Sequence, residues 1–328
     1  MKIKNKKCAL ILPYFGEFNN YFPLFLKSCA ANPSYDWIII TDNPFNYECP
    51  ENVHVISSTL ESIRWSARQK LGFDVALKDP YKLCDYKPAY GLLFEKYLED
   101  YEYWGHCDCD LIFGNLEKLL TPLLNKEYDK IFAAGHLTIY RNSFENNRRF
   151  MKTLNGRYLY REAYKTDSIF AFDEDCSGHD NVHSIFLKDG ANVYEEDLSM
   201  NSAINSAKYI RDFYDKDKHE FSREEYRRAR YYWNHGNIIR IECENGKLIN
   251  TEFLYFHFQM RKMRARVSLG AETFEILPDR FVQRKIPMDL RGMNLVTVGF
   301  PYLYWVDNYQ KKVRRLLKKY KKRKSYDT

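Results

Sequence analysis

The sequence predicts an α/β protein with a mainly parallel sheet flanked by helices. Short apolar runs at residues 8–12, 37–40 and 53–57 alternate with helical patterns near 21–29 and 58–72. This alternation is typical of a parallel sheet that has helices on both faces. The chain of 328 residues is also long enough to bury a large core.

Each unbroken apolar run is typical of a strand buried on both faces. The helix after the third strand is expected to begin with a capping box made by Ser58 and Glu61 and to end near Gly72. A further helix is expected over residues 87–100, because Pro88 stands near its start, where proline is favoured.

The second half of the chain is patterned less clearly. Residues 130–134 predict a strand, and the alternation of Leu137 and Ile139 with polar neighbours indicates a half-exposed one. Residues 144–235 are polar and irregular, and we interpret them as insertions on the acceptor side of a binding site.

Two local signals stand out in the region after residue 220. Ser222 and Glu225 predict the start of an Arg-rich helix. The pair Asn245-Gly246 predicts a hairpin between strands at 237–244 and 247–256.

Cysteine usage indicates a reducing compartment. The eight cysteines are scattered, and no Cys-x-x-Cys pair suggests a zinc site. The basic residues 2–7 and the apolar run after them faintly imitate a signal peptide, but no small-residue cleavage site follows, so we expect a first strand there. No stretch approaches the roughly 20 apolar residues of a membrane span.

The charge is concentrated in a tail. The net charge is +7, but residues 307–328 hold ten Lys/Arg against Asp307 and Asp327, so the rest of the chain is close to neutral. We therefore divide the chain into a body (1–295, with halves of about 1–140 and 141–295) and a tail (296–328).

The tail pattern predicts a basic amphipathic helix. Its apolar face comprises Tyr309, Val313, Leu316, Leu317 and Tyr320. Such a helix suits an anionic membrane surface, which we expect it to contact through residues 300–324 at the inner face of the cell membrane. A solvated basic tail is the alternative. No nucleic acid is expected, since the body has neither a basic face nor a recognised nucleic-acid module.

Two aspartates follow an apolar and aromatic run. Asp108 and Asp110 are two residues apart and would project to the same side of an extended backbone. Mn²⁺ and Mg²⁺ prefer carboxylate oxygens combined with substrate phosphates. The same spacing occurs at 173/175 and 215/217, so only the position after a buried strand separates this pair from a solvated turn.

Six stretches over roughly residues 8–262 carry a family resemblance. They are Leu-Pro-Tyr-Phe-Gly at 12–16, Ile-Ile-Thr-Asp at 39–42, Tyr-Lys-Leu-Cys-Asp-Tyr-Lys-Pro at 81–88, Cys-Asp-Cys-Asp-Leu-Ile-Phe-Gly at 107–114, Gly-His-Leu at 135–137 and Phe-His at 256–257. In this order they resemble nucleotide-sugar-dependent glycosyltransferases of the GT-A fold, in particular bacterial families that build capsular or other surface polysaccharides. The resemblance implies a Rossmann-like sheet.

The resemblance also implies a metal centre. Asp108 and Asp110 would hold Mn²⁺ or Mg²⁺ against the diphosphate of a nucleotide sugar, with a UDP-hexose as the expected donor. His257 would be the third protein ligand, and its alternative is a packed, hydrogen-bonded core histidine. Lys87 would contact the donor phosphate or sugar. Arg261 and Lys262 follow without the glycine that relatives carry, so the cation that reaches the phosphates stays open; Lys262 is the candidate.

Further residues are implied for the donor and acceptor. The donor pocket would be lined by Pro13, Tyr14, Phe15 and Asp42, with a tyrosine or phenylalanine ring stacked on the base.

Catalysis and acceptor binding would involve carboxylates in the second half. The candidates are Glu174, Asp175 and Asp180, with Asp173 and His179 as further acceptor contacts. Asp180-Asn181 weakly resembles a pair near the reacting sugar of retaining enzymes, which gives a slight preference for retention.

The expected function is therefore the transfer of a hexose to a lipid-linked or growing surface polysaccharide at the cytoplasmic membrane face. A sugar nucleotidyltransferase is one alternative, but residues 13–16 lack its glycine-rich basic loop. A non-catalytic protein that binds membranes or nucleic acid through its tail is the other.

Overall fold

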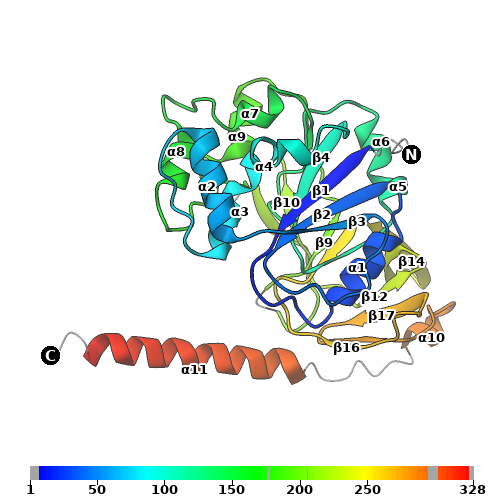
Figure 1. Ribbon diagram of the computed structural model, residues 1–328. Coiled ribbons are helices and arrows are strands. Elements are labelled where there is room, and N and C mark those ends of the chain that lie inside the picture. Colours follow the sequence, from blue (N-terminus) through cyan, green and yellow to red (C-terminus); the bar gives the residue numbers. More distant parts are fainter. Residues whose placement is uncertain (1–6, 176–177, 205, 295–301, 325–328) are drawn as a thin grey trace.

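The structure is a computed structural model that describes residues 7–175, 178–204, 206–294 and 302–324 (Figure 1). Its largest sheet has seven strands in the order β3-β2-β1-β4-β7-β6-β8. The bounds are β1 (Cys8–Pro13), β2 (Tyr35–Thr41), β3 (Val53–Ser57), β4 (Tyr103–Cys107), β6 (Lys130–Ile131), β7 (Leu137–Arg141) and β8 (Val193–Tyr194). Pairing is parallel from β3 to β4 and becomes antiparallel at β7. The expected mixed α/β class is confirmed.

Alternate residues of the central strands enter two separate cores, which explains their unbroken apolar runs. In β1, Ala9 and Ile11 pack into the core beneath α2 (Leu60–Leu71). Cys8 and Leu10 pack on the other face, beneath α1 (Phe22–Ala30) and α5 (Leu116–Leu119). Figure 1 shows helices on both faces of this sheet.

The single helix expected over 87–100 is wrong. That part of the chain is broken into short pieces: η1 (Pro80–Lys82), α3 (Leu83–Tyr86), η2 (Lys87–Ala89), α4 (Tyr90–Leu93) and η3 (Glu95–Tyr97). Pro88 stands near the start of η2, as expected, but helical turns already precede it from Pro80. Because proline has no N–H to donate, the helix is not continuous through this position. Gly91 is needed there, since a Cβ would lie 2.5 Å from the Trp104 ring.

The remaining helices follow residue 120. They are α6 (Thr121–Leu124), α7 (Asn146–Arg149), α8 (Leu159–Tyr164), α9 (Val182–Lys188), α10 (Leu290–Asn294) and α11 (Tyr302–Lys324). Strand β7 is buried along most of its length, so the half-exposed strand expected there is wrong.

A second sheet of six strands is formed by residues between 229 and 282. Its order is β14-β13-β12-β17-β18-β16. The bounds are β12 (Ala229–Asn234), β13 (Asn237–Glu244), β14 (Lys247–Phe253), β16 (Arg264–Arg266), β17 (Thr273–Leu277) and β18 (Arg280–Val282). The hairpin at Asn245-Gly246 is confirmed, and both residues have the positive φ that this turn requires.

The Arg-rich helix expected at Ser222 is wrong. Ser222 lies in β11 (Glu220–Arg223), which pairs with β10 (Asp212–Asp215) as a two-stranded hairpin. Hydrogen bonding between these strands and the ion pair between Arg223 and Asp212, at 2.7 Å, override the capping signal.

A small three-stranded sheet joins distant parts of the chain. Strand β15 (Tyr255–His257) lies between β5 (Leu111–Phe113) and β9 (Ser199–Asn201). Its register places His257 opposite both Leu111 and Asn201. This pairing brings a late strand next to the segment between β4 and β5.

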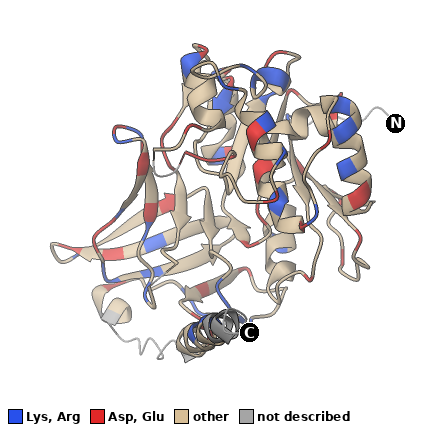
Figure 2. Ribbon diagram, turned by 90° about the vertical axis from the view of Figure 1, so that its left-hand side faces the viewer, with Lys and Arg blue, Asp and Glu red and all other residues tan. Residues whose placement is uncertain are grey.

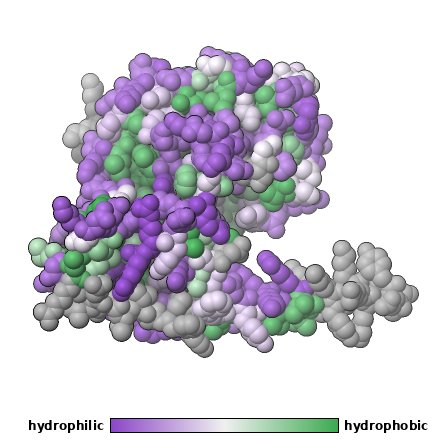
Figure 3. Space-filling view, turned by 180° about the vertical axis from the view of Figure 1, so that it is seen from behind, coloured by the Kyte–Doolittle hydropathy of each residue, from purple (hydrophilic) through white to green (hydrophobic). Residues whose placement is uncertain are grey.

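The expected tail helix is present as α11, which contacts the body through its first turns and projects beyond it (Figures 1 and 3). Its first turns are anchored by Lys262, 3.1 Å from Asp307, and by Arg261, whose guanidinium lies 5.0 Å from the centre of the Tyr304 ring. Acidic and basic residues are interspersed over the body (Figure 2). Within the described part of the chain, no helix is both long and apolar enough to cross a membrane. Residues 296–301, with which the expected tail begins, lie outside the described residues.

Four cysteines are buried thiols, as the sequence predicts: Cys8, Cys29, Cys107 and Cys109. By contrast, Cys49 and Cys243 are exposed. No disulfide is formed among the described cysteines. Cys176 and the signal-like residues 2–6 lie outside the described part of the chain.

The capping residue of α2 is Thr59, one residue after the expected Ser58. The Thr59 hydroxyl accepts a hydrogen bond from Ser62 N at 3.1 Å, and Gly72 ends the helix with φ +74°. Replacing Thr59 with alanine should lower the free energy of unfolding by about 1 kcal/mol, measured by urea denaturation. Ser58→Ala is the matched control and should leave stability unchanged; equal losses in both variants would contradict the assignment.

Candidate functional site

The candidate site lies where the strand order of the parallel part of the sheet reverses. Strand β1 pairs with β2 on one side and with β4 on the other, and ligands bind beyond the carboxyl ends of strands at such a point. Tyr14 follows β1, Asp42 follows β2 and Asp108 follows β4. Residues expected to bind donor and metal therefore share one edge of the sheet.

Three potential metal ligands meet at this edge. One oxygen each from Asp108 and Asp110 and one nitrogen of His257 lie within 4.8 Å of one another. The His257 Nε2 atom is 3.3 Å from Asp110 Oδ1 and 3.9 Å from Asp108 Oδ2. Asp110 and His257 are buried, whereas the Asp108 side chain is 33% exposed and faces the accessible side of the group.

His257 is oriented by Asn201. The His257 Nδ1–H donates to Asn201 Oδ1 at 2.9 Å, which directs Nε2 toward the two carboxylates. Gln259 Nε2 donates to the same oxygen at 2.8 Å. Burial alone would lower the pKa of His257, but the Asp110 carboxylate outweighs this and raises it. A fixed partner on the second ring nitrogen is characteristic of metal-binding histidines.

Asp110 is held by the chain that follows β15. Its backbone oxygen accepts from Phe258 N at 3.1 Å, and its Oδ2 accepts from Met260 N. Gln259 and Met260 have φ of +53° and +55°, so the chain turns sharply to make these bonds. Burial would raise the pKa of Asp110, but the neighbouring His257 and the Met260 N–H hold it below its ordinary value.

Lys87 is shared between two carboxylates. Its Nζ lies 2.8 Å from Asp108 Oδ1 and 3.2 Å from Asp173 Oδ2, and it donates to Gly135 O at 2.7 Å. Burial alone would lower the pKa of Lys87, but Asp108 and Asp173 raise it well above its usual value. Lys87 is therefore a charged ammonium directly beside the metal-ligand group.

Asp173 is the more buried of these two carboxylates. Burial raises the pKa of Asp173 to about 7; Lys87 opposes the rise, and Glu174 and Asp108 add to it. One ammonium does not fully compensate two carboxylates, so the buried one retains its proton to higher pH. Gly135 permits this approach, since a Cβ there would lie 2.5 Å from Asp173 Oδ2.

The residues present fit a divalent cation. Two carboxylates supply the oxygen ligands that Mn²⁺ and Mg²⁺ prefer, and the oriented imidazole adds one nitrogen ligand. His136 adds a second imidazole whose ring centre is 4.6 Å from that of His257. Its Nδ1 contacts the Tyr255 hydroxyl at 2.6 Å, and its buried Nε2 has no hydrogen-bond partner among the described residues.

The expected nucleotide-pocket residues lie along the same edge but differ in exposure. Pro13 ends β1, Asp42 is exposed just after β2, and Tyr14 is half-buried with its ring stacked on Phe18 at 4.8 Å. Phe15 is buried in the core beneath α2. Of the two aromatic candidates for base stacking, Tyr14 is therefore the accessible one.

The three expected catalytic carboxylates are separated in space. Glu174 lies beside the site, where its Oε2 accepts from Gly135 N at 3.3 Å. Asp180 lies 3.5 Å from the Arg157 guanidinium and does not join the metal-ligand group. Asp175 is buried and accepts from the Tyr214 hydroxyl at 2.7 Å and from Asn181 Nδ2 at 2.9 Å.

The side chain of Asn181 is hydrogen-bonded within the fold. Its Oδ1 accepts from the backbone N–H groups of His183 and Ser184 and so caps α9, while its Nδ2 is bonded to Asp175. The hydrogen-bonding groups of Asn181 are thus used inside the fold, and the expected pairing of Asp180 and Asn181 beside the reacting sugar stays a prediction.

The two cations after β15 also differ. The Arg261 guanidinium is buried and donates to the carbonyl oxygens of Ala203 and Ser206 at 3.2 and 2.8 Å. Lys262 is exposed and pairs with Asp307 of α11. Neither contacts the three metal ligands, so Lys87 is the cation that the fold places at this group.

The sequence pattern indicated Asp173 only as an acceptor contact, and it singled out neither His136 nor Asn201 as a site residue. Asp173 belongs to the second Asp-x-Asp spacing, and His136 lies in a stretch that carried the family resemblance. Asn201 gave no sequence signal, because its position depends on pairing between β9 and β15.

Comparisons with known proteins give a family and distant structural similarity. A family model described as a family of unknown function, DUF6625, matches residues 10–285. No curated protein matches the chain. The structure of galactosyltransferase LgtC with donor and acceptor sugar analogues is 8% identical, with a TM-score of 0.34, and the match covers 59% of this chain and 75% of that one. Mouse xyloside xylosyltransferase 1 in its apo form is 10% identical, with a TM-score of 0.32, covering 60% and 88%. Neither similarity is sufficient to assign an activity.

The raised pKa of Asp173 predicts a pH dependence of stability. The folded protein holds this proton more tightly than the unfolded chain, so the free energy of unfolding should fall as pH rises from about 4 to about 7 and then level off. Asp173→Asn, which carries no charge, should remove this part of the slope and gain on the order of 1–3 kcal/mol over wild type at pH 8.

Urea denaturation at several pH values, with a chelator present, measures this difference. Asp180→Asn is the control, since Asp180 is half-exposed, and this variant should not reproduce the gain of Asp173→Asn at pH 8. Parallel pH profiles for wild type and Asp173→Asn would contradict the assignment.

Proposed function

We propose that this chain, which belongs to the DUF6625 family of unknown function, is a metal-dependent glycosyltransferase that moves a sugar from a nucleotide-sugar donor to a glycan or lipid-linked glycan. The observation that carries the proposal is the meeting of Asp108, Asp110 and His257 at the carboxyl edge of parallel strands, with Lys87 beside them. These groups suit a diphosphate, which needs cations to neutralise it and oxygen-binding metal to orient it.

Asp108, Asp110 and His257 would hold Mn²⁺ or Mg²⁺. When bound, the ion would act as a Lewis acid that offsets the negative charge developing on the diphosphate leaving group. Asp110 is fixed by Met260 N and His257, whereas Asp108 is partly exposed. Asp108 is therefore the ligand that faces the substrate, and Asp110 is the buried anchor.

Lys87 would add positive charge on the donor side. Its ammonium is held by Asp108, Asp173 and the Gly135 carbonyl, so its position is fixed before substrate arrives. A preorganised cation next to the departing phosphate stabilises charge without reorganisation during the reaction. Lys262, exposed and paired with α11, would contact phosphate only after leaving Asp307.

The nucleotide would lie along the edge formed by Pro13, Tyr14 and Asp42. Tyr14 offers a half-buried aromatic face for the base, and the exposed Asp42 offers acceptors for ribose or the base edge. A UDP-hexose is the donor that we expect. Phe15 would support this pocket from the core rather than stack on the base.

The carboxylates favour retention of configuration slightly. Asp175 and Asp180 are bonded elsewhere, so neither is positioned as a general base at the metal-ligand group. Glu174 remains the nearest of the expected catalytic residues, through its bond to Gly135 N. In a retaining reaction the departing phosphate accepts the acceptor proton, and no protein base is needed.

The tail supports a membrane-bound acceptor. Helix α11 exposes Trp305, Tyr309, Val313, Leu316 and Leu317, and its sequence is dense in lysine and arginine. Aromatic and aliphatic residues beside basic ones suit the surface of an anionic bilayer. We therefore place the enzyme at the inner face of the cell membrane, acting on a lipid-linked or growing surface polysaccharide.

Replacing Asp110 with asparagine should lower transfer at least about 100-fold, because one anionic metal ligand and the partner of His257 are lost together. Radiolabelled sugar transfer from a panel of UDP-sugars, with Mn²⁺ and lipid-linked acceptors, measures this effect. A prior thermal-shift panel of nucleotide sugars with and without Mn²⁺ selects the donor.

Asp217→Asn is the matched control, since Asp217 belongs to another Asp-x-Asp spacing but is exposed on a hairpin. It should leave transfer unchanged. Full transfer by Asp110→Asn would refute the metal site, and no thermal shift with any nucleotide sugar would favour a non-catalytic binding protein.

Changing Lys311, Lys312, Arg314 and Arg315 to glutamine should weaken binding to vesicles rich in phosphatidylserine at least about tenfold, because each basic residue near the surface adds about 1 kcal/mol. Vesicle sedimentation at two salt concentrations measures the change. A control with Lys126, Lys188, Lys247 and Lys285 changed removes the same charge from exposed positions of the body. Equal weakening in both variants would contradict a specific role for α11.

A further inference from the structure

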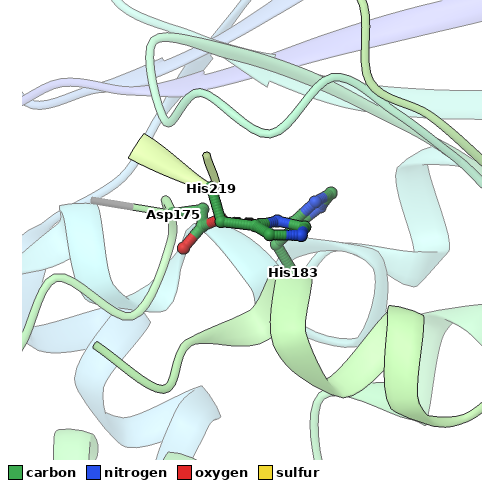
Figure 4. A group of neighbouring side chains, drawn as sticks. All are labelled: Asp175, His183 and His219. Atoms are coloured by element: carbon green, nitrogen blue, oxygen red, sulfur yellow. Dashed lines mark ion pairs between the residues drawn. The ribbon is translucent and has the colours of Figure 1, made fainter. Parts of the chain in front are cut away.

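A second group of polar side chains lies apart from the three metal ligands. Asp175, His183 and His219 each offer one ligand atom, and these atoms lie within 4.8 Å of one another. Figure 4 shows the three side chains pointing toward one another. Asp175 and His183 are buried, whereas the His219 side chain is 54% exposed. The group is thus closed on one side and reachable from solvent on the other.

The three residues come from separate segments of the chain. Asp175 lies two residues after Asp173 in the sequence. His183 lies in the first turn of α9, and His219 lies in the turn between β10 and β11. His219 has a φ of +52°, so the backbone of this turn is left-handed at His219. A bond shared by all three would fasten the β10–β11 hairpin to α9 and to the candidate site.

The spacing of the group suits a metal ion. Two ligands that each lie about 2.0–2.1 Å from a tetrahedral Zn²⁺ are about 3.3 Å apart. His219 Nδ1 is 3.7 Å from Asp175 Oδ2, which is close to that edge length without any shift of the backbone. The Tyr214 hydroxyl lies 2.7 Å from Asp175 Oδ2 and 3.1 Å from His219 Nδ1, and so bridges the same two atoms.

The surroundings of His183 resemble the outer shell of a metal site. His183 Nε2 is 2.8 Å from Glu195 Oε1, so the carboxylate fixes the ring and leaves Nδ1 for a ligand role. Lys130 Nζ lies 3.1 Å from that Nδ1, but it also donates to Phe132 O, which remains its partner if the imidazole turns to a metal.

We propose that Asp175, His183 and His219 bind a zinc-type divalent cation that clips the β10–β11 hairpin to the body. Two imidazoles and one carboxylate favour a borderline ion such as Zn²⁺ over Mg²⁺, which prefers an all-oxygen set. The clip would act close to the candidate site, since the Phe221 ring of the hairpin lies 6.4 Å from the His136 ring. This inference does not depend on glycosyl transfer.

Isothermal titration of the full chain with Zn²⁺ tests the proposal. Asp110→Asn impairs the other candidate site and should still bind one equivalent. Adding His219→Ala in that background should weaken the affinity for the remaining Zn²⁺ at least about tenfold. His219 is exposed, so the variant should fold, which circular dichroism checks.

Two matched variants separate a metal site from a hydrogen-bonded cluster. His235 is also exposed and has a positive φ of +45°, but it lies outside the group, so His235→Ala should leave binding unchanged. Tyr214→Phe removes the bridging hydroxyl and keeps all three ligands, so it should retain Zn²⁺. Hydrogen exchange in the hairpin should slow on Zn²⁺ addition, and only when His219 is present.

The proposal is overturned if Asp110→Asn binds no Zn²⁺, or if the His219→Ala substitution leaves its affinity unchanged. Loss of Zn²⁺ binding in Tyr214→Phe would show that the group is a hydrogen-bonded cluster instead. Each of these results leaves the Asp108–Asp110–His257 assignment standing, because transfer assays test that assignment separately.

Discussion

The contact between Asp110 and the segment after β15 is the constraint on which the candidate site depends. Asp110 accepts from the backbone N–H of Phe258 and of Met260, and its carboxylate lies 3.3 Å from His257 Nε2. These bonds fasten residues nearly 150 positions apart. A buried carboxylate is costly unless it is bonded, so the late strand and the Asp-x-Asp turn stabilise each other.

The charges around Lys87 do not balance. A single ammonium contacts Asp108 and Asp173, and burial raises the pKa of Asp173 although Lys87 opposes the rise. Strongly shifted pKa values of this kind cluster at functional sites. The fold keeps these charges together through the close approach of Asp173 to Gly135, where a side chain would not fit.

Local patterns predicted the parts of the fold that local forces decide. The unbroken apolar runs of β1 and β2 predicted strands buried on both faces, and Asn245-Gly246 predicted a hairpin. Both signals depend on only a few neighbouring residues. The pattern at Ser222 failed for the opposite reason: pairing with β10 outweighed a weak capping preference. Pro88 likewise broke a helix that its neighbours would otherwise have continued.

The sequence by itself determined the mixed α/β class, the position of Asp108 and Asp110 after a buried strand, and the basic amphipathic character of the tail. Apolar periodicity and charge are local properties, so they can be read along one chain. Only the tertiary structure decided that His257 lies beside these aspartates and that Asn201 orients it. It also placed Asp175 in a separate group with His183 and His219. Those contacts depend on the register of β15 between β5 and β9, which is set by burial and backbone pairing across the whole chain.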